Sequence, residues 1–323
     1  MPEIKVLVTG VGAIIGQGIV RSLRMSKLNI RITGVDADSR AVGFHFCDDW
    51  LVCPRADSDD FAGWIAETCD QMRIDLVLPG IPQDVEALAA QRHIETETRA
   101  KVVLNSPEAI RLGLDKWETF LFLRKHGLPV PTTALAAWIT AERARNILGF
   151  PCLLKPRRGS ASKGIVLVHD ADEYDFFTKR RSDYIAQRLI GTDNEEYTCG
   201  IFGLGDGVCT DAIVMKRKSS SVSFTAEAVV DDYNDVRKVA IATAEATGAV
   251  GPTNIQIRKY NGIPMVLEIN PRISSSTSLR AAFGFNEAEM CIQRFILGEV
   301  PHPVAKRGFA QRYVEDFIVS REG

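Results

Sequence analysis

Short apolar runs alternate with stretches of helical periodicity in the N-terminal third of the chain. The runs Ile4–Val8, Ile30–Val35 and Asp75–Leu78 are typical of strands, and Ile19–Leu23 follows the first run with a helix-like pattern. Such alternation predicts βαβ units around a parallel sheet. We therefore expect a Rossmann-like α/β domain over residues 1–108.

The first apolar run is followed by glycines at Gly10, Gly12, Gly16 and Gly18, and Asp36 ends the second run. This arrangement is similar to a dinucleotide-binding turn, although the spacing is loose. Glycines are also required wherever a helix packs closely against a strand. We interpret Asp36 as a cap or turn residue rather than a ribose ligand.

Two helix-start signals follow the strand–helix alternation, beginning near residue 105. Ser106 is a candidate N-cap before Pro107, and Asp115 with Glu118 forms a capping-box pattern. Lys116 then lies in a first helical turn, where its charge opposes the helix dipole. A nearby anion would justify a lysine there, and a solvated surface lysine is the alternative.

A strand, a basic loop and a returning strand follow between residues 152 and 168. The apolar run Cys152–Leu154 leads to Lys155, and the loop Gly159–Gly164 is rich in small residues. No G-K-[ST] sequence precedes a helix here, so this is not a Walker loop. Backbone N–H groups and cations of such a hairpin can still bind phosphates, and we favour that function.

A carboxylate, an amide and a guanidinium occupy every second position of a strand-like run at Glu268, Asn270 and Arg272. Alternate residues of a strand share one face, so Leu267 and Ile269 are expected to point into a core. Carboxylate and amide oxygens suit Mg²⁺, and arginine suits phosphate. The pattern therefore indicates a metal and phosphate site on one strand face.

Taken in sequence order, these motifs resemble the ATP-grasp superfamily. Within it, they are most similar to the synthetase halves of the carbamoyl-phosphate synthase large subunit and to carboxylate–amine ligases. The resemblance covers nearly the whole chain and rests on Ile74–Gly80, Leu114–Lys116, Phe150–Pro156, Gln187–Gly191, Glu195–Thr198, Asn254–Gln256 and Leu267–Arg272.

The resemblance implies a three-part α/β architecture that is α+β in its C-terminal part. Residues 1–108 form a Rossmann-like pre-ATP-grasp domain, and residues 109–186 contain linker helices and the lid of the ATP-grasp fold. Residues 187–323 form the C-terminal ATP-grasp subdomain, with an antiparallel sheet and the metal site. ATP is expected between the lid and that sheet.

The resemblance also implies a role for each matching residue. The residues expected to bind the nucleotide are Lys116, Lys155, Gly159, Ser160, Ser162, Gly164, Gln187, Arg188, Leu189 and Glu196. In this set the lysines and the glycine loop contact phosphates, Gln187 to Leu189 meet adenine, and Glu196 binds the ribose. The residues expected to hold Mg²⁺, with Mn²⁺ as the alternative metal, are Gln256, Glu268 and Asn270. Arg272 and Lys155 are the expected catalytic residues.

The activity implied is ATP-dependent ligation of a carboxylate to an amine through an acyl phosphate, with ADP and phosphate released. Phosphorylation of bicarbonate or carbamate is one alternative. A Rossmann NAD(P)-dependent oxidoreductase is a weaker one, because no tyrosine has a lysine four residues later.

Three features depart from the family pattern or stay open. Gln187 stands where the related branch often has a carboxylate, and Lys216–Glu227 matches no substrate pattern. Arg280 could clamp a substrate carboxylate, with a surface arginine as the default interpretation. The substrates themselves are therefore not specified by the motifs.

The turn Asn261–Gly262 favours a two-residue hairpin that pairs Tyr260 with Ile263. A regular hairpin of this kind turns Gln256 away from Glu268. If Gln256 joins the metal site, one strand must shift by one residue.

That shift requires a longer loop that takes in Ile263 or a bulge near Pro264. We therefore predict an irregular hairpin in which Gln256 shares a face with Glu268. In the same register, Asn254 lies opposite Asn270.

Composition narrows the setting of this activity. The chain has 323 residues, 46% of them hydrophobic and 25% charged, and a net charge of −2, without a long basic run. These values give no electrostatic footprint for nucleic acid or an anionic membrane. The partners that the resemblance implies are instead small-molecule carboxylate and amine substrates. The seven cysteines are scattered, which argues against a disulfide framework. We expect a cytoplasmic enzyme with cysteines mostly in its cores, and a homodimer is one of the open assembly states.

Overall fold

The structure is a computed structural model that describes residues 2–159, 163–205, 207–219, 224–313 and 315–318. The chain divides into two compact units. Unit 1 contains residues 1–104, 225–229 and 272–323, and unit 2 contains residues 105–224 and 230–271. The segment after Pro271 thus groups with the N-terminal domain, whereas the sequence boundaries had grouped it with the C-terminal subdomain.

Unit 1 is built on a parallel sheet with the strand order β3-β2-β1-β4-β5. Helices connect these strands, as the alternating pattern predicted. The N-terminal elements are β1 (Ile4–Thr9), α1 (Ile14–Arg24), β2 (Ile30–Asp36), the 3₁₀ turn η1 (Val42–Phe46), β3 (Asp49–Val52), α2 (Phe61–Met72), β4 (Leu76–Leu78), α3 (Pro82–Ala90), α4 (Ile94–Glu97) and β5 (Lys101–Val102). Later segments add β13 (Thr225–Val230), α10 (Thr277–Ala282), α11 (Glu287–Phe295) and β16 (Gly308–Gln311).

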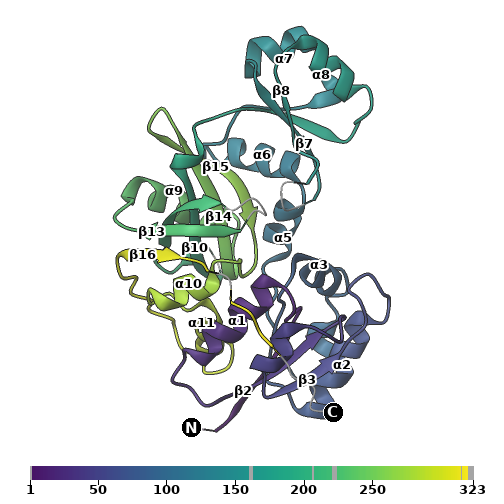
Figure 1. The fold of residues 1–323 in the computed structure, drawn as a ribbon, viewed down its shortest axis with the longest axis vertical. Coiled ribbons are helices and arrows are strands. Elements are labelled where there is room, and N and C mark those ends of the chain that lie inside the picture. The colour runs from purple at the N-terminus through teal and green to yellow at the C-terminus, as the bar shows by residue number, and fades with distance from the viewer. Residues whose placement is uncertain (1, 160–162, 206, 220–223, 314, 319–323) are drawn as a thin grey trace. The chain divides into compact units, whose positions relative to one another are not determined.

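Unit 2 begins with α5 (Pro107–Leu114) and α6 (Lys116–Lys125), which lead into a small antiparallel sheet (Figure 1). Its strand order is β6-β9-β7-β8, and we call it the lid sheet. Its elements are β6 (Thr133–Leu135), the 3₁₀ turn η2 (Ala136–Trp138), α7 (Ala141–Leu148), β7 (Cys152–Pro156), β8 (Val166–Val168), α8 (Ala171–Thr178) and β9 (Tyr184–Arg188). The expected boundary between residues 186 and 187 falls inside β9.

The lid sheet has one apolar and one polar face. Cys152, Leu154 and Ala186 join residues of α7 and α8 in a buried cluster. Successive strand residues point to opposite faces, so Lys155 and Gln187 lie on the face away from those helices. The alternation of apolar and polar residues in β7 thus places Lys155 on the polar face of the lid sheet, where it is partly buried.

The second sheet of unit 2 has the order β15-β14-β10-β12, and we call this part the main sheet. Its elements are the 3₁₀ turn η3 (Asp193–Glu195), β10 (Glu196–Gly205), β11 (Val208–Cys209), which pairs with β10, β12 (Ile213–Ser219), α9 (Asn234–Ala246), β14 (Val250–Tyr260) and β15 (Ile263–Asn270). One face packs on α9 through a buried cluster that includes Cys199, Ile255, Ile269 and Ala240. The other face carries the polar residues of the strands.

The hairpin between β14 and β15 has the predicted two-residue turn. Asn261 and Gly262 have φ values of 50° and 77°, and Tyr260 pairs with Ile263. Both positive φ values are those of a type I′ turn. The longer loop through Ile263 and the bulge near Pro264 were both wrong, because the ladder is regular there.

The register shifts further along the hairpin, between Gln256 and Ile257. Ile257 pairs with Val266, but Gln256 pairs with Glu268, so Leu267 is the extra residue of a β-bulge. Gln256 and Glu268 are direct cross-strand neighbours, which confirms the predicted irregular hairpin. The bulge lies next to Gln256 and Glu268 rather than at the Asn261–Gly262 turn.

The bulge also changes which residues enter the core. Val266 and Ile269 belong to the cluster against α9, whereas Leu267 is only partly buried. The expectation that Leu267 points into the core was wrong, because the extra residue breaks the two-residue period at that point. Beyond the bulge, Asn254 pairs with Asn270 as predicted.

Candidate active site

Lys155 is the cation at the centre of the lid's polar face. Its Nζ donates to Oε1 of Gln187 at 2.7 Å, and Nε2 of Gln187 donates to Oγ1 of Thr133 at 3.0 Å. Burial lowers the pKa of Lys155 to about 8, and Glu268 on the main sheet partly opposes that shift. The lid lysine and the main-sheet carboxylate are therefore within electrostatic reach of each other.

The Gln187 side chain is largely occupied by these two contacts. It is 6% exposed, and both its oxygen and its nitrogen have protein partners. The glutamine amide oxygen accepts a hydrogen bond from the lysine without adding a negative charge. Its neighbour Arg188 donates from Nη2 to the Ile147 carbonyl at 2.8 Å. The adenine contacts expected for Gln187, Arg188 and Leu189 stay a prediction.

Lys116 begins α6 and reaches the start of the glycine loop. Its Nζ donates to the Gly159 carbonyl at 2.8 Å, and its backbone N–H donates to the Arg157 carbonyl at 3.0 Å. Burial is the main cause of the lowered pKa of Lys155 and Glu268 opposes it, but the positive charge of Lys116 lowers that pKa further. The two predicted phosphate lysines are therefore brought together. Gly164 has a φ of 77°, and Ser160 and Ser162 lie outside the described residues.

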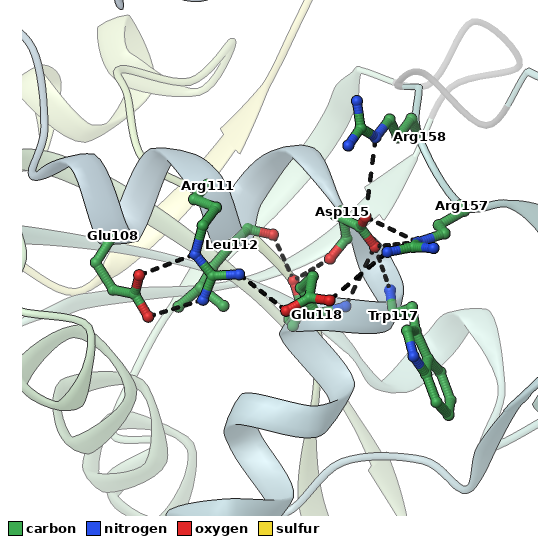
Figure 2. A network of polar contacts seen from close by, with 9 residues as sticks. Glu108, Arg111, Leu112, Asp115, Trp117, Glu118, Arg157 and Arg158 are labelled. Carbon is green, nitrogen blue, oxygen red and sulfur yellow. Dashed lines mark hydrogen bonds and ion pairs between the residues drawn. The ribbon is translucent and has the colours of Figure 1, made fainter.

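Figure 2 shows the network that holds the start of α6 beside Arg157 and Arg158, which follow β7. Asp115 is the N-cap and accepts from the N–H groups of Trp117 and Glu118 at 3.0 and 3.2 Å. Arg157 Nε donates to the same carboxylate at 2.8 Å. Glu118 pairs with Arg111 at 2.8 Å and with Arg157 at 3.6 Å. The Asp115 N–H donates to the Leu112 carbonyl, so the predicted capping box is not completed.

Glu196, at the start of β10, is held between two arginines. Nε of Arg217 donates to its Oε1 at 2.8 Å, and Nη2 of Arg258 donates to its Oε2. Burial raises the pKa of Glu196, but the ion pairs with Arg217 and Arg258 outweigh burial, so the net pKa is lowered. The expected contact of Glu196 with ribose hydroxyls is untested.

Gln256, Glu268 and Asn270 come together on the polar face of the main sheet. The register places Gln256 opposite Glu268, and Asn270 follows on the same strand face. Their donors are a carboxylate and two amides, which fit a hard cation such as Mg²⁺ that completes its shell with phosphate oxygens and water. Across the described residues, no group of three or more His, Cys, Asp or Glu side chains lies together.

Two arginines after the main-sheet strands belong to unit 1. Arg272 Nη1 donates to the Ile273 carbonyl at 3.1 Å, and its predicted phosphoryl contact stays a prediction. Arg280 is fully buried and pairs with Glu287 at 2.8 Å. The default interpretation of Arg280 as a surface residue was therefore wrong, and its buried partner leaves no open face for a substrate carboxylate.

The glycine turn of unit 1 is satisfied internally. Asp36 accepts from the backbone N–H of Gly12 at 2.7 Å and from that of Asp38 at 2.9 Å. This is the turn role expected from the sequence. A Cβ at Gly16 would lie 2.2 Å from the Gly10 carbonyl oxygen, so close helix–strand packing accounts for that glycine.

Two family models match the chain. Residues 114–276, just over half of the 323 residues, match the model described as ATP-grasp domain. Residues 6–103 match the model described as PylC-like, N-terminal domain. The chain therefore belongs to the ATP-grasp family. The family and the mixed α/β fold predicted from the sequence are confirmed.

Individual relatives agree with this assignment. The carbamoyl phosphate synthase large chain of Methanocorpusculum labreanum is 26% identical over 84% of this chain, which spans 28% of that relative's length. A structure of N5-carboxyaminoimidazole synthetase from Staphylococcus aureus with ADP is 14% identical, with a TM-score of 0.77 over 96% of this chain and 82% of its own. An L-amino acid ligase structure from Bacillus licheniformis is 16% identical, with a TM-score of 0.66 over 94% and 75%.

The chain thus spans about a quarter of the length of that synthase large chain. At such low identity the two solved structures establish the fold alone. Over the described part of the chain, no helix combines the length and the apolar character needed to cross a bilayer. All seven cysteines are free, and most are buried, as their scattered spacing predicted.

Sequence reasoning missed Arg217 and Arg258. Both lie on strands of the main sheet, and their side chains are only 11% and 16% exposed. Arginine is rarely buried to this extent without a specific partner, which is here the carboxylate of Glu196. Arg258 lies two residues after Gln256, and Arg217 lies in the Lys216–Glu227 segment that matched no substrate pattern. Neither position pointed to Glu196 until the strand register was known.

Proposed function

We propose that the protein joins a small-molecule carboxylate to an amine at the expense of ATP, through an acyl phosphate, with ADP and phosphate released. The observation that supports this most is the row of Gln256, Glu268 and Asn270 on one face of the main sheet, together with the electrostatic effect of Glu268 on Lys155 of the lid sheet. A nucleotide between two such sheets meets a cation from one and a metal-binding carboxylate from the other.

The charge around Lys155 fits a polyphosphate. Among the described residues, the charged side chains that interact here include the cations Lys116, Lys155, Arg217 and Arg258 and the carboxylates Asp193, Glu196 and Glu268. Cations outnumber carboxylates, so an anionic ligand offsets charge that the protein leaves unbalanced. We assign Lys116, Lys155 and the Gly159–Gly164 loop to the phosphates.

The rest of the predicted nucleotide and metal sites follow from the same proposal. Gln187 to Leu189 meet adenine mainly through the backbone, because the Gln187 side chain already has partners. Glu196 binds the ribose, and Glu268, Asn270 and Gln256 hold Mg²⁺. When bound, Mg²⁺ neutralises phosphate charge and aligns the γ-phosphoryl group.

In the first step, a carboxylate oxygen of the substrate attacks the γ-phosphorus and the bond to the ADP oxygen breaks. Lys155 holds a proton at Nζ and faces the phosphates, so it stabilises the charge that moves onto ADP. Arg272 stabilises the transferring phosphoryl group. The amine nitrogen then attacks the acyl carbon, loses a proton, and phosphate leaves.

A second candidate is phosphorylation of bicarbonate or carbamate. It is favoured by the 26% identity to a carbamoyl phosphate synthase large chain. The two candidates share the first step and differ in the acid that attacks. A cytoplasmic location and a homodimer remain parts of the proposal.

The test is an ADP-release assay with Mg²⁺, ATP, pooled carboxylates and pooled amines, run beside an arm that contains bicarbonate and ammonia. Release that needs both pools supports the ligase, and release with bicarbonate alone supports the second candidate. Calorimetry that detects NAD(P) binding and no ATP binding would contradict both.

A further inference from the structure

The three strands β12, β10 and β14 bring Arg217, Glu196 and Arg258 into one row. Glu196 pairs with Arg258 in the register of β10 and β14, and Arg217 follows Lys216, which pairs with the residue after Glu196. Both carboxylate oxygens of Glu196 therefore meet a guanidinium. Glu196 is itself 12% exposed, so the whole row is shielded from solvent.

The two arginines differ in what else they contact. Arg217 Nη2 also donates to the Gln256 Oε1 at 3.3 Å. Within the described residues, Arg258 pairs with Asp193 at 3.1 Å instead, and that carboxylate is 95% exposed. Only Arg217 thus connects Glu196 to the residue that faces Glu268 across the bulge.

The hydrogen bond from Arg217 orients the Gln256 amide, because Arg217 can donate to the amide oxygen but not to the amide nitrogen. An amide oxygen has two lone pairs, so it can accept from a guanidinium and still bind a cation. Without that donor, the Gln256 amide loses the hydrogen bond that orients its oxygen. Loss of a side chain that hydrogen-bonds to a metal ligand and orients it commonly lowers metal affinity by about one to two orders of magnitude.

We propose that Arg217 is a positioning residue for the metal site, which holds the Gln256 oxygen in place to bind Mg²⁺ and links it to Glu196. The inference rests on the proposed function, since it takes Gln256 as a metal ligand and Glu196 as a nucleotide contact. It assigns the metal-related role to Arg217 and not to Arg258, although both hold the same carboxylate.

The experiment measures how much Mg²⁺ strengthens nucleotide binding. Calorimetry gives the Kd of the non-hydrolysable ATP analogue with a β,γ-imido bridge, with and without saturating Mg²⁺. The ratio of the two values reports coupling between the sites, independently of catalysis. Arg217→Gln is expected to reduce that ratio by about tenfold or more. The matched control Arg258→Gln removes the same charge and should weaken both Kd values while the ratio stays that of the wild type.

Arg217→Lys provides the test if Arg217→Gln does not fold. Lysine keeps the charge but cannot donate to two partners with a rigid fork, so the metal-free Kd should stay close to wild type while the ratio falls. Equal ratios in the wild type, Arg217→Gln and Arg217→Lys would overturn the inference, and so would equal losses in the Arg217 and Arg258 variants. A wild-type protein that does not bind the analogue would instead refute the proposed function.

Discussion

The glycine turn after β1 in unit 1 and the polar face of the main sheet in unit 2 differ in how their polar groups are satisfied. In the turn, Asp36 accepts from two backbone N–H groups, and Gly16 allows two backbone segments to touch. At the main-sheet site, Glu268 acts electrostatically on Lys155 of the lid sheet, whose hydrogen-bond acceptor among the described residues is the neutral amide oxygen of Gln187.

This difference separates packing from ligand binding. Backbone groups that satisfy a carboxylate leave it little capacity for a ligand. A cation whose pKa is lowered to about 8 by burial is, by contrast, stabilised by any anion that arrives. Packing and backbone hydrogen bonds therefore explain the glycine turn, whereas the buried charge of Lys155 indicates an anionic ligand.

The largest expected effect is on the sheet face. Glu268→Gln keeps the shape of the side chain but removes its charge, so turnover should fall by about 100-fold or more with little change in melting temperature. ADP release and a thermal melt measure the two quantities. Glu142→Gln, at an exposed position of α7, is the control and should keep full turnover. Normal turnover by the Glu268 variant would make Glu268 a structural residue.

The next effect is on the glycine turn and concerns stability only. Gly16→Ala should lower the free energy of unfolding by about 1–3 kcal/mol, because the new Cβ meets backbone rather than a movable side chain. Gly63→Ala on α2 is matched to it, since its Cβ would meet nothing within 4 Å, and should stabilise by about 0.5–1 kcal/mol. Denaturant titration measures both. Loss of ATP affinity in folded Gly16→Ala would contradict a pure packing role.

The charge of Lys155 gives a pH dependence with a defined sign. Its pKa in the free protein is about 8, and bound phosphates raise it, so the complex keeps a proton that the free protein loses above pH 8. ATP affinity should be constant below that pH and fall above it, by at most about tenfold per pH unit. Calorimetry between pH 7 and 9.5 measures this. Lys155→Arg stays charged, so any similar fall in that variant would assign the effect to another group.

The smallest effect is expected for Asp36→Asn. The amide keeps one acceptor oxygen for the turn, so the free energy of unfolding should change by less than about 1 kcal/mol. ATP affinity should not change at all. Asp36→Ala removes both acceptors and should destabilise more. If the protein bound NAD(P) with an affinity that depended on Asp36, the glycine turn of unit 1 would be a dinucleotide-binding site and not only a packing feature.

Local signals in the sequence were sufficient for several parts of the fold. Ser106 and Asp115 cap their helices because short polar side chains reach the free N–H groups of the first turn. Asn261–Gly262 forms its two-residue turn because glycine and asparagine tolerate positive φ. The alternation of Glu268 and Asn270 placed both on one face, because that rule holds within one uninterrupted stretch of strand.

What the sequence determined by itself was thus the family, the order of the elements and the residues of one polar strand. The tertiary structure decided where the hairpin register shifts. The turn sets one register as far as Ile257, and the pairing of Gln256 with Glu268 follows a register one residue away, so Leu267 becomes the extra residue of the bulge. It also decided that Arg217 and Arg258 meet at Glu196. Those contacts join strands far apart in the chain, so no local pattern encodes them, and only strand pairing brings them within hydrogen-bonding distance.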